Sequence, residues 1–366
     1  MATTSPAQQP WMDSTGAWER PSRCCAGDDA GRPPLTAAQV EQWRTRGFVL
    51  VDGLFPAALT ARAAVEIEWQ LGKSDDGQAF EFPSSPCPSL NTLTLHPRVI
   101  RASRQLLGLP GDDELTSLRL TLSKLLTRVG PAATAQSGPE DLFINIYGQR
   151  MHTDFPDFTL LAPPPFSEAP EMVQCLLYFD EVEEMGGTTA VVPCEGLDDP
   201  AYAAPGPGQP FPVAGAPPFP WTNDRQGTER RFAEAEDHPE IVAFRERLYA
   251  REVRVHYQPG TALLMRMDTW HRGTRNKPGA KRRTMQLGYR RADAEWTSQV
   301  GGWALELLRD PEWAFSSLMA NASVEQRGVL GWPKPGHRYW TEATITGVVR
   351  RYGSFGFDER PYRAAL

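Results

Sequence analysis

The sequence predicts a mainly β fold with flanking helices, in which antiparallel strands form a sandwich or barrel. The middle of the chain holds many short apolar segments bounded by turn residues, and helical patterns do not alternate regularly with them. Helical periodicity is found instead near the two ends of the chain and over residues 239–249. Short strands without helices between them favour a sandwich or barrel over a doubly wound parallel sheet.

Helical patterns surround the first expected strand near the N-terminal end. Thr36 and Gln39 have the spacing of a capping box, which marks the start of a helix. An apolar strand over 48–51 follows, and further helices are expected after Pro56 and from Pro97. We expect these helices to flank the β core.

The core strands are expected from short apolar segments that end at turn residues. These segments cover residues 118–127, 142–147, 172–179, 188–192, 253–257, 261–267 and 284–289. Together they place the β core at about residues 115–291.

A single domain over residues 35–366 is the expected organisation. Residues 1–34 are rich in Pro, Ser, Gly and Asp and predict a flexible tail. Residues 195–250 form a Pro- and Gly-rich and then charged insertion, which could be a lid over a substrate or a plain surface loop. Residues 292–366 predict a helical C-terminal extension.

The composition limits which partners and which cellular location we expect for the protein. The net charge is −7 with both signs well represented, which argues against a nucleic-acid partner. No apolar run is long enough to span a membrane, and the N-terminus lacks the apolar segment of a secretory signal. The five cysteines form no CxxC pair, which argues against a disulfide framework. We therefore expect a cytoplasmic protein, and its oligomeric state stays open.

A possible metal-binding constellation stands out among the polar residues. His152 and Asp154 lie two residues apart, so both point to the same face if they lie on a strand. His271 follows the expected strand over 261–267. Two imidazoles and one carboxylate are the ligands of a facial triad, which suits non-haem Fe(II) and leaves coordination positions open. Taken singly, either histidine could equally be a structural or an exposed imidazole.

Arg282 opens the last expected core strand, eleven residues after His271. A planar guanidinium at that place could bind a carboxylate through two hydrogen bonds. The alternative is a solvated charge cluster, since Lys281 and Arg283 flank it.

Together these features resemble the phytanoyl-CoA dioxygenase family of Fe(II)- and 2-oxoglutarate-dependent oxygenases. In that family an Asn follows the distal His at five residues and an Arg at eleven, and both spacings hold here. The resemblance covers roughly residues 35–291. It rests on residues 35–53, the triplet at 152–154, residues 178–193, the pair Trp270-His271, and Gly273, Asn276 and Arg282.

The resemblance implies a double-stranded β-helix, a jelly-roll or cupin-like core with the metal at one open end. It implies Fe(II) as cofactor, bound by His152, Asp154 and His271, with Arg282 binding the distal carboxylate of the cosubstrate 2-oxoglutarate. The implied reaction uses O2 to hydroxylate an unactivated C–H bond of a small-molecule substrate, releasing succinate and CO2. Because Asp154 fills the position that related halogenases leave open for chloride, it argues against halogenation.

The sequence departs from the family pattern beside the distal histidine. Several family members carry a Ser two residues after that histidine, where this chain has Gly273. Thr274 could replace the serine as a cosubstrate contact. Lys124, on the strand expected over 118–127, could be another such contact or could face solvent.

Other activities stay open at the level of sequence. The same iron chemistry could end in desaturation or cyclisation. A cupin-like protein could bind metal or ligand without turnover, and a zinc hydrolase could use the same three ligands. Arg282 and Asn276 favour the oxygenase, because a metal-binding module or a hydrolase does not need a carboxylate-binding arginine there.

Overall fold

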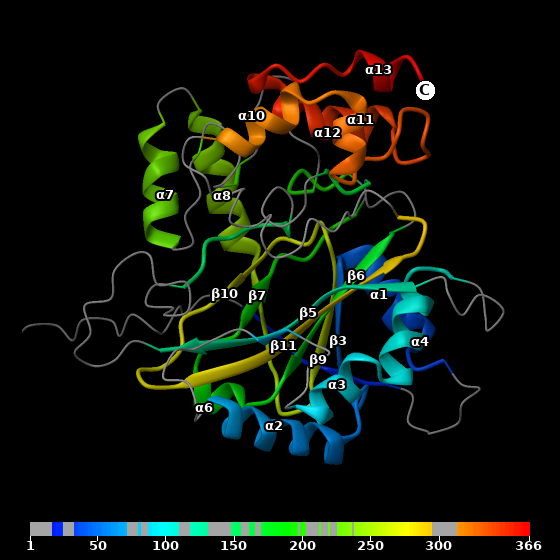
Figure 1. Cartoon of the computed structure of the whole chain (residues 1–366). Coiled ribbons are helices and arrows are strands. Elements are labelled where there is room, and N and C mark those ends of the chain that lie inside the picture. Colours follow the sequence, from blue (N-terminus) through cyan, green and yellow to red (C-terminus); the bar gives the residue numbers. More distant parts are fainter. Residues whose placement is uncertain are drawn as a thin grey trace, which may run out of the picture.

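Two β-sheets lie at the centre of the chain, and helices surround them (Figure 1). The computed structural model describes residues 17–24, 33–71, 80–81, 87–109, 118–130, 148–154, 161–164, 170–196, 198–202, 212–213, 219, 225–235, 238–294 and 313–366. Over these residues helices account for more of the chain than strands do. The expectation of a mainly β fold is therefore corrected to a mixed fold with a β centre, because the helices at both ends and in the insertion are longer than most strands.

The larger sheet contains seven strands among the described residues, in the order β2-β3-β9-β6-β11-β5-β4. Only the pair β2 and β3 is parallel. The remaining pairs are antiparallel, as expected for short strands without helical connections. Its strands are β2 (Ser22–Arg23), β3 (Phe48–Asp52), β4 (Phe80–Glu81), β5 (Leu118–Val129), β6 (Met172–Tyr178), β9 (Ala262–Arg266) and β11 (Lys281–Arg291).

The smaller sheet has the order β1-β8-β7-β10 in the described part of the chain. Here β1 and β8 are parallel and the other pairs are antiparallel. Beyond β10, the chain at His152 adds one antiparallel bridge to His271. The strands are β1 (Ala17–Glu19), β7 (Thr189–Val191), β8 (Val253–Val255) and β10 (His271–Gly273).

The two sheets pack face to face through apolar side chains. Tyr178 of the larger sheet stacks on Tyr257, which follows β8, with ring centroids 4.2 Å apart and planes 9° apart. Residues from both sheets belong to one buried cluster, and its other members are Phe48, Leu50, Leu176, Val182, Val191, Val255, Leu263 and Met265. This packing places the inner faces of β3, β6 and β9 opposite the smaller sheet.

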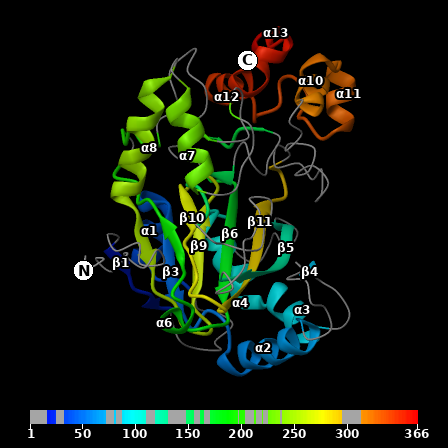
Figure 2. The same ribbon diagram turned by 90° about the vertical axis from the view of Figure 1, so that its left-hand side faces the viewer.

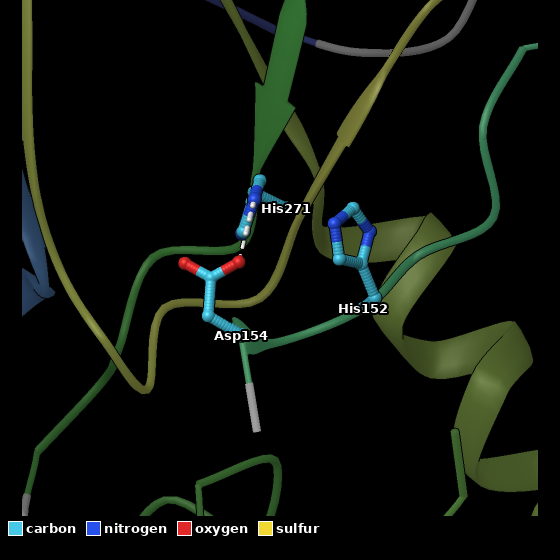
Figure 3. A group of neighbouring side chains, drawn as sticks. All are labelled: His152, Asp154 and His271. Carbon is cyan, nitrogen blue, oxygen red and sulfur yellow. Dashed lines mark ion pairs between the residues drawn. The ribbon is translucent and has the colours of Figure 1, made fainter. Parts of the chain in front are cut away.

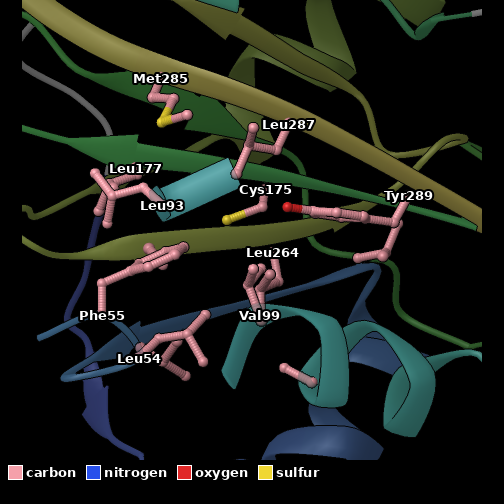
Figure 4. Packing of buried hydrophobic residues seen from close by; sticks show 14 of the residues in the cluster. Leu54, Phe55, Leu93, Val99, Cys175, Leu177, Leu264, Met285, Leu287 and Tyr289 are labelled. Carbon is pink, nitrogen blue, oxygen red and sulfur yellow. The ribbon is translucent and has the colours of Figure 1, made fainter. Parts of the chain in front are cut away.

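Four helices form a second core with the outer face of the larger sheet. Figure 4 shows Leu54, Phe55 and Val99 packed near Cys175 and Leu264 of the sheet, all of them members of one buried cluster. Cys175 of this cluster is a free cysteine and a core residue, as its place in an apolar strand predicts. The helices are α1 (Ala37–Arg46), α2 (Ala57–Leu71), α3 (Pro88–Thr94) and α4 (Pro97–Leu106).

The expected capping box at the start of α1 is confirmed. The hydroxyl of Thr36 accepts a hydrogen bond from the backbone N–H of Gln39, and the side chain of Gln39 accepts one from the N–H of Thr36. Gly47 ends the helix in a left-handed conformation with φ of 89°. These contacts are local, which explains why the sequence predicted the helix and its ends.

Two helices of the insertion lie beyond one end of the strands, above β10 in Figure 2. They are α7 (Arg225–Glu234) and α8 (Pro239–Arg251). Leu248 of α8 belongs to a buried cluster with Met151, Val192 and Trp270. The insertion therefore packs on the core through buried apolar side chains.

The C-terminal helices gather at the end of the molecule opposite α2 (Figure 1). Their buried cluster is rich in aromatic residues and also includes Leu161 and Ala294, which connect it to the rest of the chain. In the described parts of the chain, no helix is both long and apolar enough to cross a membrane. The remaining helices are α6 (Val182–Met185), α10 (Ala314–Asn321), α11 (Val324–Val329), α12 (Glu342–Tyr352), the 3-10 turn η3 (Gly353–Phe355) and α13 (Arg360–Arg363).

Some elements of the structure were not expected from the sequence, and one expected strand cannot be compared with it. Residues 17–24, expected within a flexible tail, include β1 and β2, which pair along the edges of both sheets. The strand β10 and the helix α3 were not expected, because neither short, polar segment shows a clear periodicity. The strand expected over 142–147 lies outside the described residues.

Candidate metal centre

His152, Asp154 and His271 converge from two segments of the chain (Figure 3). One candidate ligand atom from each of these buried residues lies within 4.8 Å of the other two. Nε2 of His271 is 3.9 Å from Oδ1 of Asp154, and the two imidazole centroids are 4.3 Å apart. The three residues are 5%, 1% and 8% exposed, in chain order. The structure thus brings together the three residues that the sequence singled out.

A backbone bridge brings the two histidines together. The N–H of His152 donates to the carbonyl of His271 at 3.0 Å, and the N–H of His271 donates to the carbonyl of His152 at 2.8 Å. Residues directly opposite each other in an antiparallel pair project to the same face. His271 also opens β10, which pairs with β7, so the bridge fixes His152 against the smaller sheet.

Both imidazoles are oriented by the same type of contact. Nδ1 of His152 lies 3.1 Å from the carbonyl oxygen of Arg150, and Nδ1 of His271 lies 2.9 Å from that of Thr269. A carbonyl oxygen only accepts, so each Nδ1 carries the proton and each Nε2 keeps a lone pair. This is the tautomer that metal-bound histidines commonly adopt.

The surroundings of His152 favour its neutral form. Burial lowers the pKa of His152 well below its ordinary value, and the neighbouring His271 and Arg150 lower this pKa further. A metal binds the neutral imidazole, so this shift favours ligation at neutral pH.

Asp154 is oriented from the larger sheet. The side-chain amide of Gln174 on β6 donates to Oδ2 of Asp154, while Oδ1 lies on the side of His271. Gln174 is only 2% exposed. Gln174 was not expected from the sequence, although a carboxamide inside an apolar strand is a signal that could have revealed it.

Arg282 of β11 lies beside this group and is only 3% exposed. Its Nη2 is 3.2 Å from the position that a Cβ on Gly273 would occupy, two residues after His271. Its Nε and Nη1 are buried and have no hydrogen-bond partner among the described residues. Burying a guanidinium without a counter-charge costs several kcal/mol of folding free energy. The site is therefore suited to an anionic ligand.

A second arginine lies directly across from Arg282 in the sheet. The register of β11 and β5 pairs Arg282 with Arg128. Burial lowers the pKa of Arg128 to about 9, and the charge of Arg282 contributes to the same shift. The sequence did not identify Arg128, because only the register of the two strands places it here. The two cations together strengthen the preference of this region for an anion.

The other two predicted cosubstrate contacts differ from each other. The hydroxyl of Thr274 accepts from the N–H of Thr188 at 2.8 Å and lies 3.2 Å from its carbonyl oxygen, so it joins β10 to the start of β7. Lys124 is half-buried and pairs in register with Gln286. Because alternate residues share a face, Lys124 lies on the same face of the larger sheet as Arg282.

Asn276 has a structural position. It is fully buried, and its side-chain amide donates to the backbone carbonyl of Arg128 at 2.6 Å. It therefore holds β5 beside β11 at the pair of arginines.

Comparisons with known proteins give remote structural likenesses. The chain is similar to the non-haem alpha ketoglutarate dependent carbocyclase SnoK from nogalamycin biosynthesis, at 17% identity and a TM-score of 0.49 over 77% of this chain and 93% of that one. It is also similar to the epimerase SnoN in complex with Fe3+, alpha ketoglutarate and nogalamycin RO, at 16% identity and a TM-score of 0.45 over 73% and 87%. A third likeness is to EctD from S. alaskensis with 2-oxoglutarate and 5-hydroxyectoine, at 14% identity and a TM-score of 0.45 over 75% and 82%.

No protein-family model and no curated protein sequence matches the chain. The resemblance to the phytanoyl-CoA dioxygenase family therefore stays a prediction. At these identities and TM-scores, inference about function depends on the residues of the chain itself.

Proposed function

We propose that this chain is an Fe(II)- and 2-oxoglutarate-dependent oxygenase that hydroxylates an unactivated C–H bond of a small-molecule substrate. One observation carries the proposal: a buried His-Asp-His group lies beside Arg282, whose guanidinium has two nitrogens without a partner among the described residues. A metal site needs only the His-Asp-His group. A cosubstrate that bears a carboxylate would account for the unpartnered nitrogens of Arg282.

The three residues fit a metal ion of this class. His152 and His271 would each offer Nε2, because their Nδ1 atoms face backbone carbonyls. Asp154 would offer Oδ1, because Oδ2 accepts from Gln174. Two imidazoles and one carboxylate suit ferrous iron and leave room for other ligands. When bound, ferrous iron and 2-oxoglutarate supply an O2-dependent oxidation that releases succinate and CO2.

Arg282 fits the distal carboxylate of 2-oxoglutarate. A planar guanidinium binds a carboxylate through two parallel hydrogen bonds, and such charged bonds are stronger where water is excluded. Because Gly273 has no side chain, the guanidinium can lie against the backbone of β10, where a Cβ would be 3.2 Å from Nη2. Lys124 and Thr274 remain further candidate contacts of the cosubstrate.

The protein's contribution is to orient these groups and keep water away. Low exposure of the three ligand residues limits solvent access to the reacting centre. We also propose that the two facing sheets form a double-stranded β-helix, as in the phytanoyl-CoA dioxygenase family, within one domain over residues 35–366. The packing of both sheets on one cluster supports this architecture.

Formation of succinate tests the proposal. Protein reconstituted with Fe(II) should convert 2-oxoglutarate to succinate slowly in air, even without the substrate, and His152→Ala should abolish this conversion. Wild-type protein that binds iron but forms no succinate above the level of free iron would contradict it. Desaturation or cyclisation would use the same residues and would appear as a product that lacks the added oxygen atom.

A further inference from the structure

Helix α8 contacts the backbone next to His152 through two side chains. The N–H of Met151 donates to the hydroxyl of Tyr249 at 3.0 Å. The carbonyl of Met151 accepts from Nη2 of Arg245 at 3.0 Å. Both backbone groups of the residue that precedes a candidate ligand are thus held by the insertion.

A carboxylate on α7 fixes these two side chains. Glu229 accepts from Nε and Nη2 of Arg245 at 2.6 and 2.7 Å, and from the hydroxyl of Tyr249 at 2.7 Å. Arg245 is only 1% exposed. Burial raises the pKa of Tyr249, so its hydroxyl keeps the proton that it donates to Glu229 while it accepts from Met151. Every member of this network therefore has a defined donor or acceptor role.

The same helix reaches the segment that carries His271. Glu252, directly after α8, accepts two hydrogen bonds from Arg272, each of 2.6 Å. Arg272 is fully buried, and Phe244 of α8 meets the ring of Trp270 edge to face at 5.7 Å. The two neighbours of His271 in the chain are thus both in contact with α8 or its C-terminal end.

These contacts follow from the alternation of strand side chains. His152 and His271 project toward Asp154, so their chain neighbours project to the opposite side, where α8 lies. A displacement of either backbone segment would move an imidazole by a similar distance. Metal ligands need to be held to within about 0.5 Å of a productive geometry.

We propose that α8, together with Glu252 directly after it, is a positioning element of the metal centre. Arg245, Tyr249 and Glu252 hold His152 and His271 at the separation that a metal requires. This inference rests on the proposed function. It assigns the insertion over 195–250 a role in the site, beyond that of a surface loop.

Binding of Co(II), a spectroscopic substitute for iron, tests the inference in the variant Tyr249→Phe. The substitution removes one hydroxyl and leaves Arg245 paired with Glu229. We expect Co(II) affinity, followed through its visible absorption, to fall about tenfold or more, as when groups that orient metal ligands are removed. In the metal-free protein, the amide hydrogen of Met151 should exchange faster with solvent.

Tyr289→Phe is the matched control. It also removes one tyrosine hydroxyl, which donates to the carbonyl of Thr94 at 2.6 Å in the core under the larger sheet. This variant should lose thermal stability and keep its Co(II) affinity. Equal Co(II) affinity in wild type and Tyr249→Phe, or equal losses in both variants, would overturn the positioning role. Failure of the wild type to bind Co(II) would instead overturn the proposed function, and the inference would fall with it.

Discussion

The guanidinium of Arg282 lies against the backbone of Gly273: a Cβ on that glycine would be 3.2 Å from Nη2. The same Cβ would be 2.8 Å from Oε1 of Gln149, which accepts a hydrogen bond from the N–H of Gly273. Gln149 therefore occupies the space into which a side chain at residue 273 would project. This arrangement connects the candidate anion site to the metal centre, since Gly273 follows His271 by two residues.

Replacing Arg282 with alanine should raise the KM for 2-oxoglutarate with a much smaller effect on Fe(II) binding. A charged hydrogen-bonded contact contributes about 1.5–3 kcal/mol, so the KM should rise about tenfold to a hundredfold. Steady-state succinate formation measures this. Arg282→Lys should recover part of the loss, because it keeps the charge without the planar fork.

Arg283→Ala provides the control for this measurement. Arg283 is the next residue on β11, projects to the opposite face and donates to Asp180 through Nε at 2.8 Å. Its replacement should lower stability and leave the KM for 2-oxoglutarate unchanged. A normal KM in Arg282→Ala would show that Arg282 does not bind the cosubstrate.

A larger side chain at Gly273 should obstruct the same site. Gly273→Val would place its methyl groups against Arg282 and Gln149, so we expect weaker 2-oxoglutarate binding and retained Co(II) binding. Isothermal titration of the metal-loaded protein measures both ligands. Gly328→Val is a suitable comparison, because a Cβ on Gly328 would meet nothing within 4 Å. Equal 2-oxoglutarate affinity in the two variants would contradict the placement of the cosubstrate.

The replacement Gln174→Leu should weaken metal binding without any direct contact to the metal. Leucine has a similar size and removes the amide that donates to Asp154. Loss of such an orienting group typically lowers metal affinity about tenfold to a hundredfold. Titration with Co(II) should show this loss, and Gln174→Glu should not restore affinity, because a second carboxylate would repel Asp154. Wild-type affinity in the leucine variant would mean that Asp154 needs no support from β6.

Metal and cosubstrate should each stabilise the folded chain. A ligand that binds only the native state at one hundred times its Kd adds about 2.7 kcal/mol to the free energy of unfolding. We therefore expect Tm to rise with a divalent metal and again with 2-oxoglutarate, and to return to its starting value after chelation. In Arg282→Ala the increase in Tm caused by the metal should persist, and the further increase caused by 2-oxoglutarate should be smaller. If 2-oxoglutarate raised the Tm of the metal-free protein as much as that of the metal-loaded protein, this would contradict binding of 2-oxoglutarate at the metal centre.

The local parts of the fold were predictable from the sequence, and the long-range parts were not. The capping box of Thr36 and Gln39 correctly predicted where α1 begins, because its hydrogen bonds lie within one turn of helix. The strand β10 was not predicted, because His271, Arg272 and Gly273 acquire strand geometry only by pairing with β7 and His152. Short elements of this kind depend on tertiary pairing more than on propensity.

In the candidate site, too, some residues could be predicted from the sequence and others could not. The sequence identified His152, Asp154 and His271 as a possible ligand set and Arg282 as a possible carboxylate contact. It did so on the premise that His152 and Asp154 share a strand, whereas His152 forms an isolated β-bridge and Asp154 lies in a helical turn. Gln174 and Arg128 lie in other strands and enter the site only through sheet register, which the sequence of one chain does not reveal. The contacts of α8 were hidden for a similar reason, since they involve backbone groups of Met151.

Anaerobic addition of 2-oxoglutarate to the Fe(II)-loaded protein tests the central claim most directly. A weak visible charge-transfer band should appear in the wild type when 2-oxoglutarate chelates the iron, and His271→Ala should show none. Wild-type protein that binds Fe(II) and yet gives no band at saturating 2-oxoglutarate would contradict the claim that His152, Asp154 and His271 form the iron site of a 2-oxoglutarate-dependent oxygenase.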